Sequence, residues 1–328
     1  MNAEPNVNPQ TKDGRGNIAP ATIILPTLAM ETKGEVGNKD IDDFFKILNS
    51  NLIDAKKILE ERFWYICSQS PKAGQFMYEN NTMHGFDGKD IFSAMKHGTL
   101  AVGQIGLAET LQILIGKDHT SNEGMELAKK IEKLFNTKCS EFKHEKHHSD
   151  KYGDFYLNYG VYYTPAENLC KKAMDKFKET YGVIPNVSEN KFFTNSIHVP
   201  VWKELSPFDK IDIESQLTGY SNAGCITYVE LDSGAKNNLT ALEQIVNYAM
   251  DKDIPYFAIN VPADTCLDCG YTDEINDKCP ICGSENIQRL RRVTGYLTGN
   301  YTAAFNDGKI QEVEMRYKHS NKMKGWEK

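Results

Sequence analysis

Four cysteines in the last quarter of the chain have the spacing of a metal site. They form two Cys-x-x-Cys pairs separated by nine residues, at Cys266, Cys269, Cys279 and Cys282. Each pair can place two thiolates on one tight turn, and two facing turns form a tetrahedral sulfur cage. Gly270 and Gly283 follow the pairs, and a residue without a Cβ lets such a turn close. We therefore predict a structural Zn²⁺ site. Iron would also fit, and a pair of redox dithiols is the less suited alternative.

A glycine-containing loop follows the cysteines closely. Thirteen residues beyond Cys282 lies Gly295, in the sequence Arg-Val-Thr-Gly-Tyr-Leu, and Gly299 comes four residues later. Taken alone, the two glycines indicate only a turn that needs backbone freedom.

Hydrophobic periodicity ahead of the cysteines predicts an α/β domain. The expected helices cover residues 40–69, 100–115, 121–142, 165–181 and 239–251. The expected strands cover residues 18–26, 154–163, 192–201, 224–231 and 254–261. Because strands and helices alternate, the core should be an α/β structure. We divide the chain into residues 1–262, a cysteine ribbon at 263–288, and a loop-rich, charged segment at 289–328.

Composition narrows the classes of function. The chain has 328 residues, a net charge of −7 and 40% hydrophobic residues, without a run of roughly 20 apolar residues that could cross a membrane. We expect no direct nucleic-acid binding, and a cytoplasmic, reducing location. Arg289, Arg291 and Arg292 form the one local basic cluster, which is either a local nucleic-acid contact or a solvated or ion-paired stretch. The histidines at residues 144–148 are interpreted as a solvated face.

The glycine loop resembles the radical-bearing loop of glycyl-radical enzymes, whose core is Arg-x-x-Gly-Tyr. A four-cysteine ribbon directly before that loop is characteristic of the anaerobic (class III) ribonucleotide reductases, and the chain resembles their C-terminal half. Further matching blocks begin with Gly-Arg-Gly-Asn and end with Arg-Tyr-Lys-His. They lie at residues 14–26, 103–109, 163–167, 193–200, 221–230 and 316–319.

The resemblance implies the second half of a ten-stranded α/β barrel, followed by a zinc ribbon and a glycyl-radical loop. Gly295 would carry the radical, and Asn17 would lie by the substrate ribose, although a turn residue is the simpler interpretation of Asn17. Thr194, Asn195 and Ser196 would bind substrate phosphate, or would only satisfy their own backbone. Glu109 and Glu167 are interpreted as structural carboxylates, as at a helix start.

The family reaction reduces ribonucleotides to 2′-deoxyribonucleotides for DNA synthesis. Gly295 would pass its radical to a cysteine, the thiyl radical would abstract the ribose 3′ hydrogen, and formate or a thiol system would supply the electrons. That cysteine lies shortly before the segment matching Asn17, but residues 1–16 contain no cysteine. We therefore expect the N-terminal half, with its nucleotide-sensing domain, as a separate chain or a lost segment. We also expect this polypeptide alone to be inactive.

The resemblance also implies partners. These are a radical-SAM activating enzyme that uses S-adenosylmethionine and an iron–sulfur cluster, a ribonucleoside triphosphate substrate, and a second copy in a homodimer. Two alternatives stay open at this point. One is another glycyl-radical enzyme, of the pyruvate formate-lyase type; the other is a non-catalytic zinc-ribbon interaction module.

Overall fold

The computed structural model describes residues 16–80, 82–293 and 295–320. Its helices are α1 (Leu25–Glu31), α2 (Ile41–Cys67), α3 (Gln75–Glu79), α4 (Ile91–Met95), α5 (Leu107–Ile115), α6 (Asn122–Lys143), α7 (Leu169–Tyr181), α8 (Pro207–Thr218), α9 (Leu239–Asp251), α10 (Tyr301–Ala304) and α11 (Asp307–Glu314). Its strands are β1 (Asn17–Ile24), β2 (Gly34–Glu35), β3 (Asn38–Lys39), β4 (Thr99–Ile105), β5 (Lys146–Ser149), β6 (Gly153–Tyr156), β7 (Asn158–Val161), β8 (Thr227–Glu230), β9 (Phe257–Asn260), β10 (Ala263–Cys266), β11 (Thr272–Asp273), β12 (Ile287–Val293) and β13 (Tyr296–Thr298).

Parallel strands joined by helices form the frame of the molecule. The order β1–β4–β7 makes one parallel sheet, and β8 pairs with β9 in parallel. A single parallel bridge between Tyr162 and Gly224 links the end of β7 to the segment entering β8. Parallel neighbours need crossover connections, which the intervening helices supply. The predicted α/β architecture is thus confirmed.

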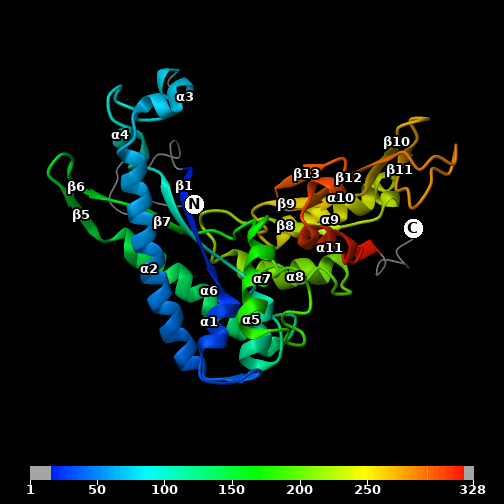
Figure 1. The fold of residues 1–328 in the computed structure, drawn as a ribbon, viewed down its shortest axis with the longest axis horizontal. Coiled ribbons are helices and arrows are strands. Elements are labelled where there is room, and N and C mark those ends of the chain that lie inside the picture. The colour runs from blue at the N-terminus through cyan, green and yellow to red at the C-terminus, as the bar shows by residue number, and fades with distance from the viewer. Residues whose placement is uncertain (1–15, 81, 294, 321–328) are drawn as a thin grey trace.

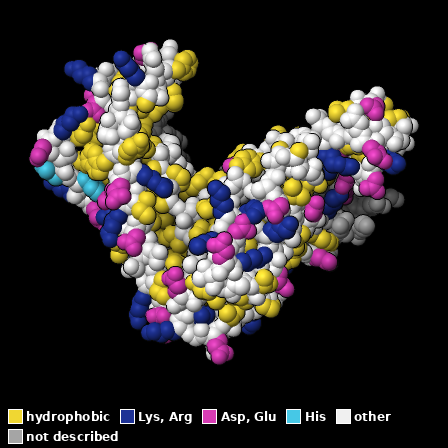
Figure 2. Space-filling model, viewed as in Figure 1, with side chains coloured by type: hydrophobic (Ala, Val, Ile, Leu, Met, Phe, Trp, Pro, Cys, Tyr) yellow, Lys and Arg dark blue, Asp and Glu magenta, His cyan; other side chains and the backbone are white. Residues whose placement is uncertain are grey.

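Two arms give the molecule an open shape (Figure 1). One arm carries α2, α3, α4 and the β5–β6 hairpin, and the other carries β8 to β13 with α9, α10 and α11. The space-filling surface is hollowed between the arms (Figure 2), and hydrophobic side chains gather along the first arm beside this hollow. No helix in the described part of the chain is long and apolar enough to cross a bilayer.

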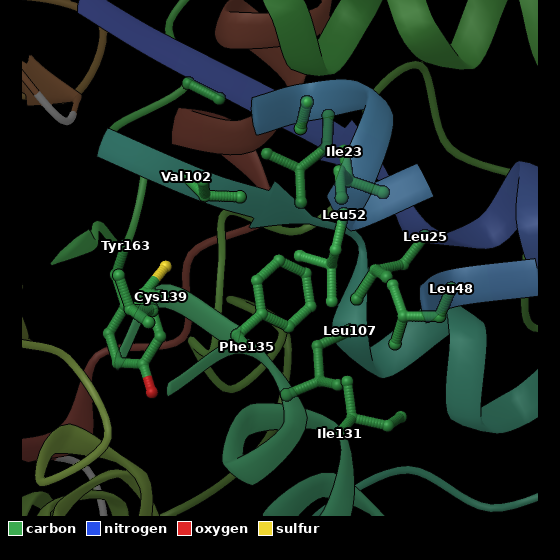
Figure 3. Packing of buried hydrophobic residues seen from close by; sticks show 14 of the residues in the cluster. Ile23, Leu25, Leu48, Leu52, Val102, Leu107, Ile131, Phe135, Cys139 and Tyr163 are labelled. Carbon is green, nitrogen blue, oxygen red and sulfur yellow. The ribbon is translucent and has the colours of Figure 1, made fainter. Parts of the chain in front are cut away.

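The main core lies where α2 and α6 cover the parallel sheet. The Asp40 side chain caps α2 by accepting a hydrogen bond from the Asp43 amide, and the buried positions of α2 recur at helical spacing. In Figure 3, Leu52 of α2 lies beside Phe135 of α6, and Leu48 lies beside Leu25. Burial of such large side chains supplies most of the driving force for folding.

The structure corrects the predicted helix over residues 100–115. Residues 99–105 form β4, whose every residue is buried, and α5 begins only at Leu107. Gly106 separates the two with a φ of +78°, a left-handed conformation that favours glycine. A continuous apolar run fits a buried strand and a buried helix equally well, so periodicity could not separate them.

Two further boundaries differ from prediction. Residues 192–201 are not a strand: they form turns with one antiparallel bridge, between Ile105 and Asn195. Their polar groups bond to side chains and carbonyls of neighbouring segments instead of to a strand ladder. Helix α7 starts at Leu169 rather than at residue 165, and ends as predicted before Gly182, whose φ is +74°.

Glu132 offers a test of the core through pH. This carboxyl is fully buried, and burial raises its pKa to about 8, against the hydrogen bond that it accepts from Gln104. The folded state therefore binds a proton that the unfolded state releases, so this stabilisation exists below the ordinary pKa and is lost as pH rises through about 8. Relative to Glu132→Gln, we expect the wild-type unfolding free energy to fall by about 2 kcal/mol between about pH 5 and about pH 8, measured by urea unfolding. If the unfolding free energies of the wild type and Glu132→Gln changed with pH by the same amount, the prediction would be wrong.

Candidate functional site

The four predicted metal ligands lie together. The sulfur atoms of Cys266, Cys269, Cys279 and Cys282 all lie within 4.8 Å of one another. The Sγ–Sγ distances are 3.6 Å for Cys266–Cys282 and 3.5 Å for Cys269–Cys279. Zn–S bonds of about 2.3 Å in a tetrahedron give sulfur separations of roughly 3.8 Å, so the donor set fits zinc.

Each cysteine pair sits on a tight turn of the same design. The Gly270 amide donates to the carbonyl of Cys266, and the Gly283 amide donates to that of Cys279, both at 2.9 Å. The two glycines have φ values of +75° and +73°, which a side chain would strain. The glycines at these positions thus serve the turn geometry inferred from the sequence.

A small antiparallel sheet joins the cysteine site to the glycine loop. Its strand order is β11–β10–β12–β13. Cys266 at the end of β10 pairs with Ile287 at the start of β12, and Val293 at the other end of β12 pairs with Tyr296 of β13. Gly295 thus lies at the tip of the β12–β13 hairpin, which we call the glycine hairpin. Strand β12 crosses the predicted boundary at residue 288, so ribbon and hairpin share one strand.

Asp264 is the main charged contact of this sheet. Its carboxylate is fully buried and accepts hydrogen bonds from Arg291 at 2.5 and 3.1 Å and from the Ile275 amide at 3.0 Å. Arg289 lies 3.7 Å from the same carboxylate. Arg292 lies over the ring of Tyr228 at 5.5 Å. Arg289 and Arg291 are therefore paired with Asp264, and Arg292 packs on Tyr228. For the two paired arginines this agrees with the ion-paired interpretation.

The glycine hairpin reaches the frame through Glu167. A Cβ built on Gly295 would lie 2.6 Å from Oε1 of Glu167. Tyr296 donates a hydrogen bond to the same carboxylate, which raises the pKa of the phenol above its usual value. Glu167 follows β7, and the carboxyl ends of parallel strands are the usual place for ligands in α/β proteins. No local pattern in the sequence predicts this contact, because it joins residues far apart in the chain.

Asn195 and Ser196 hold the segment that carries Glu167. Oδ1 of Asn195 accepts the amide of Ala166 at 2.8 Å, and the Ser196 hydroxyl donates to the Thr164 carbonyl at 2.8 Å. Ser196 has a φ of +40°, a strained value for a residue with a side chain. Both side chains are thus bonded within the molecule, and their predicted binding of substrate phosphate stays a prediction.

Thr194 lies beside the start of α5. Its amide and hydroxyl donate to Oε1 of Glu109 at 2.9 and 2.7 Å, and its carbonyl accepts the Gly106 amide at 2.9 Å. Glu109 is 3% exposed, and burial raises its pKa to about 6 in spite of these hydrogen bonds. Glu109 therefore anchors the Thr194 loop, in line with a structural carboxylate.

Asn17 begins β1 and contacts a distant segment. Its Nδ2 donates to the carbonyl of Ala223 at 2.9 Å, close to the Gly224 bridge at the end of β7. The structure thus brings Asn17 to one of the sequence blocks that matched, and its role at the ribose stays a prediction.

The end of the described chain ties these parts together. Arg316 donates to the carbonyl of Arg292 at 2.7 Å and pairs with Glu230 at 3.3 Å. Lys318 pairs with Glu274 of the ribbon. Segment 316–318 therefore links the base of the glycine hairpin to β8 and to the cysteine ribbon.

Comparison with known proteins identifies the family. A family model described as anaerobic ribonucleoside-triphosphate reductase matches residues 2–319. The reductase of that name from Escherichia coli (strain K12) is 32% identical over 94% of this chain and 43% of its own length. That of Enterobacteria phage T4 is 31% identical over 94% of this chain and 49% of its own. A solved structure titled anaerobic ribonucleotide reductase covers 93% of the chain with a TM-score of 0.70, at 19% identity.

The chain spans less than half the length of these curated relatives. The match favours neither a pyruvate formate-lyase type enzyme nor a non-catalytic ribbon module. Since the family model covers nearly the whole chain, this protein belongs to the anaerobic ribonucleoside-triphosphate reductase family.

Proposed function

We propose that this chain is the C-terminal catalytic part of an anaerobic ribonucleoside-triphosphate reductase, and that Gly295 carries its glycyl radical. The observation that carries the proposal is the contact of the glycine hairpin with Glu167, at the carboxyl end of β7. The four cysteines at the other end of β12 would hold the zinc that stabilises the hairpin's base.

A glycine suits a radical centre for chemical reasons. An unpaired electron at Cα is delocalised into the two flanking peptide groups, and the centre flattens as it forms. A side chain would resist this flattening and would meet Glu167. A radical-SAM activase, which uses S-adenosylmethionine and an iron–sulfur cluster, would remove one hydrogen atom from Gly295.

The radical would next pass to a cysteine thiol, with return of a hydrogen atom to Gly295. The thiyl radical would take the 3′ hydrogen of a ribonucleoside triphosphate, the 2′ hydroxyl would leave as water, and formate or a dithiol would supply two electrons. Cys67, Cys139 and Cys170 do not suit this role, because they are buried in the main hydrophobic core, where a nucleotide cannot reach them. We propose that the cysteine comes from a segment outside these 328 residues.

The order of the parallel strands supports the proposal that this chain forms half of a ten-stranded barrel. The parallel order β1–β4–β7 continues through the Tyr162–Gly224 bridge to β8 and β9. Strand β1 lies at the edge of its sheet, beside the hollow in Figure 2. An unpaired edge favours pairing with a further strand. The N-terminal half of the reductase would complete the barrel there, and the complete enzyme would form a homodimer.

Substrate phosphate would bind where the Thr194 loop meets α5. The amino-terminal end of a helix attracts anions, and the Thr194 loop lies at the amino-terminal end of α5. Asn17 would face the ribose, since it bonds to the segment that leads into β8.

Electron paramagnetic resonance tests the proposal. We expect the anaerobic zinc-loaded chain, mixed with a radical-SAM activase, S-adenosylmethionine and reductant, to give a doublet split by the single remaining Cα hydrogen. Protein with Gly295 dideuterated should give a collapsed doublet, and Gly295→Ala should give no signal. Gly219→Ala, at a glycine where an added Cβ would meet nothing within 4 Å, is the matched control and should keep the doublet.

A doublet that survives in Gly295→Ala would overturn the assignment. If the wild type gives no signal, the measurement is repeated with the N-terminal half of a relative added. A signal that appears only then would keep the radical on Gly295 and locate the activase dock outside this chain, whereas continued absence would sink the proposal.

A further inference from the structure

A side chain at residue 295 would meet a neighbouring residue. The obstacle is one side chain: an added Cβ would lie 2.6 Å from Oε1 and 3.7 Å from Cδ of Glu167. The Glu167 carboxylate therefore lies directly against the Cα of Gly295.

The same carboxylate holds the neighbouring residue. Tyr296 donates its hydroxyl hydrogen to Glu167, and its ring stacks on Phe305 at 5.9 Å. One side chain thus contacts two successive residues at the tip of the glycine hairpin. A hydrogen bond to a charged acceptor is stronger than one between neutral groups.

The support of Glu167 is rigid. Its own amide donates to the Pro165 carbonyl at 3.0 Å, and Asn195 and Ser196 fix the residues just before it. A preorganised receptor of this kind loses little conformational entropy when the hairpin docks. Glu167 is therefore in place whether or not the hairpin lies on it.

We propose that Glu167 is a positioning residue that docks the glycine hairpin, through its contact with Gly295 and its hydrogen bond from Tyr296. The inference deepens the proposed function and rests on it for the role of Gly295. A macromolecular activase needs the hairpin tip detached from Glu167, whereas radical transfer needs it docked. Glu167 sets the balance between these two positions, without taking part in the chemistry.

Hydrogen–deuterium exchange of the whole zinc-loaded chain tests the dock without any radical. We expect Glu167→Ala and Tyr296→Phe each to speed exchange of the β12 and β13 amides roughly tenfold or more, since each removes a hydrogen bond to a charged group. The double variant should exchange no faster than Glu167→Ala. Glu167→Gln keeps an acceptor and should restore most of the protection. Exchange in α2 reports whether each variant is folded.

Tyr248→Phe is the matched control. Its hydroxyl donates to Asp212 at 2.8 Å, away from the glycine hairpin, so its loss should leave hairpin exchange unchanged. Gly295→Ala adds a steric test: it should loosen the hairpin in the wild-type background, because the carboxylate must move away, but not further in Glu167→Ala. The proposed dock is wrong if Glu167→Ala and Tyr296→Phe both leave the exchange of the hairpin amides unchanged. It is also wrong if the effects of the two substitutions on the exchange rate are additive in the double variant.

Measuring radical formation provides a second test of the dock. With activase present, we expect the doublet to appear faster in Glu167→Ala than in wild type, because the tip is detached from residue 167 for a larger fraction of time. If the Glu167 and Tyr296 variants exchange faster but the wild type forms no radical, the dock is supported and the radical role of Gly295 is wrong. If the wild type forms the radical but Glu167→Ala and Tyr296→Phe act independently on hairpin exchange, Gly295 keeps its role and the proposed dock is wrong.

Discussion

Removing the metal is expected to unfold residues 263–288 and to release the glycine hairpin with them. The ribbon has almost no core of its own: its buried apolar cluster consists of Cys266, Ile275 and Cys279, and two of these are predicted metal ligands. Structural zinc contributes about 10–16 kcal/mol to small domains of this kind. The large core of the parallel sheet does not include these residues and should stay folded.

Hydrogen–deuterium exchange before and after chelation measures this directly. Protection of β10 and β12 should vanish with the zinc, while α2 and β4 keep theirs. Cys282→Ser should act like the chelator, and Cys225→Ser, a cysteine outside the cluster, should not. A ribbon that keeps its protection after elemental analysis finds no metal would show that the cysteines fold without it.

Asp264→Ala is expected to destabilise the ribbon and hairpin by about 3–5 kcal/mol, the cost of breaking a buried charge pair. The substitution removes a fully buried acceptor and leaves Arg291, with 16% of its side chain exposed, without its main partner. It also leaves the Ile275 amide without the carboxylate. Both losses fall on the sheet that connects the cysteine site to Gly295.

Zinc affinity is a sensitive measure of this change, because folding and metal binding are coupled. Asp264→Ala should weaken zinc binding in competition with a chromophoric chelator. Asp277→Ala is the matched control: Asp277 is an exposed carboxylate in the same ribbon. Equal affinities for the two variants would mean that the buried pair does not stabilise the ribbon.

Local patterns in the sequence predicted well wherever a structure depends on near neighbours. The cysteine cage follows from the spacing within two turns, and α2, α6 and α9 follow from apolar residues at helical spacing. Where a run was apolar throughout, as at β4 and α5, periodicity carried no information and a single glycine decided the boundary.

Contacts between distant segments were beyond local reasoning. The segment from residue 289 on was expected to be rich in loops, but it contains β12, β13, α10 and α11, because β12 gains its partner from β10. Glu167 gave no signal beyond a carboxylate near a helix start. Its importance arises only when the hairpin, more than a hundred residues later, folds back onto it.

The pairing of β10 with β12 has a consequence for the order of folding. Cys266 meets Ile287 and Val293 meets Tyr296, so these contacts close short loops. In the parallel sheet, by contrast, Asn17 must find Thr99, and Thr99 must find Asn158. Closing a longer loop costs more entropy, and structures of low contact order form faster. The ribbon and glycine hairpin can therefore fold early as a local unit. The hairpin contacts Glu167 only later, when the more slowly forming parallel sheet is complete.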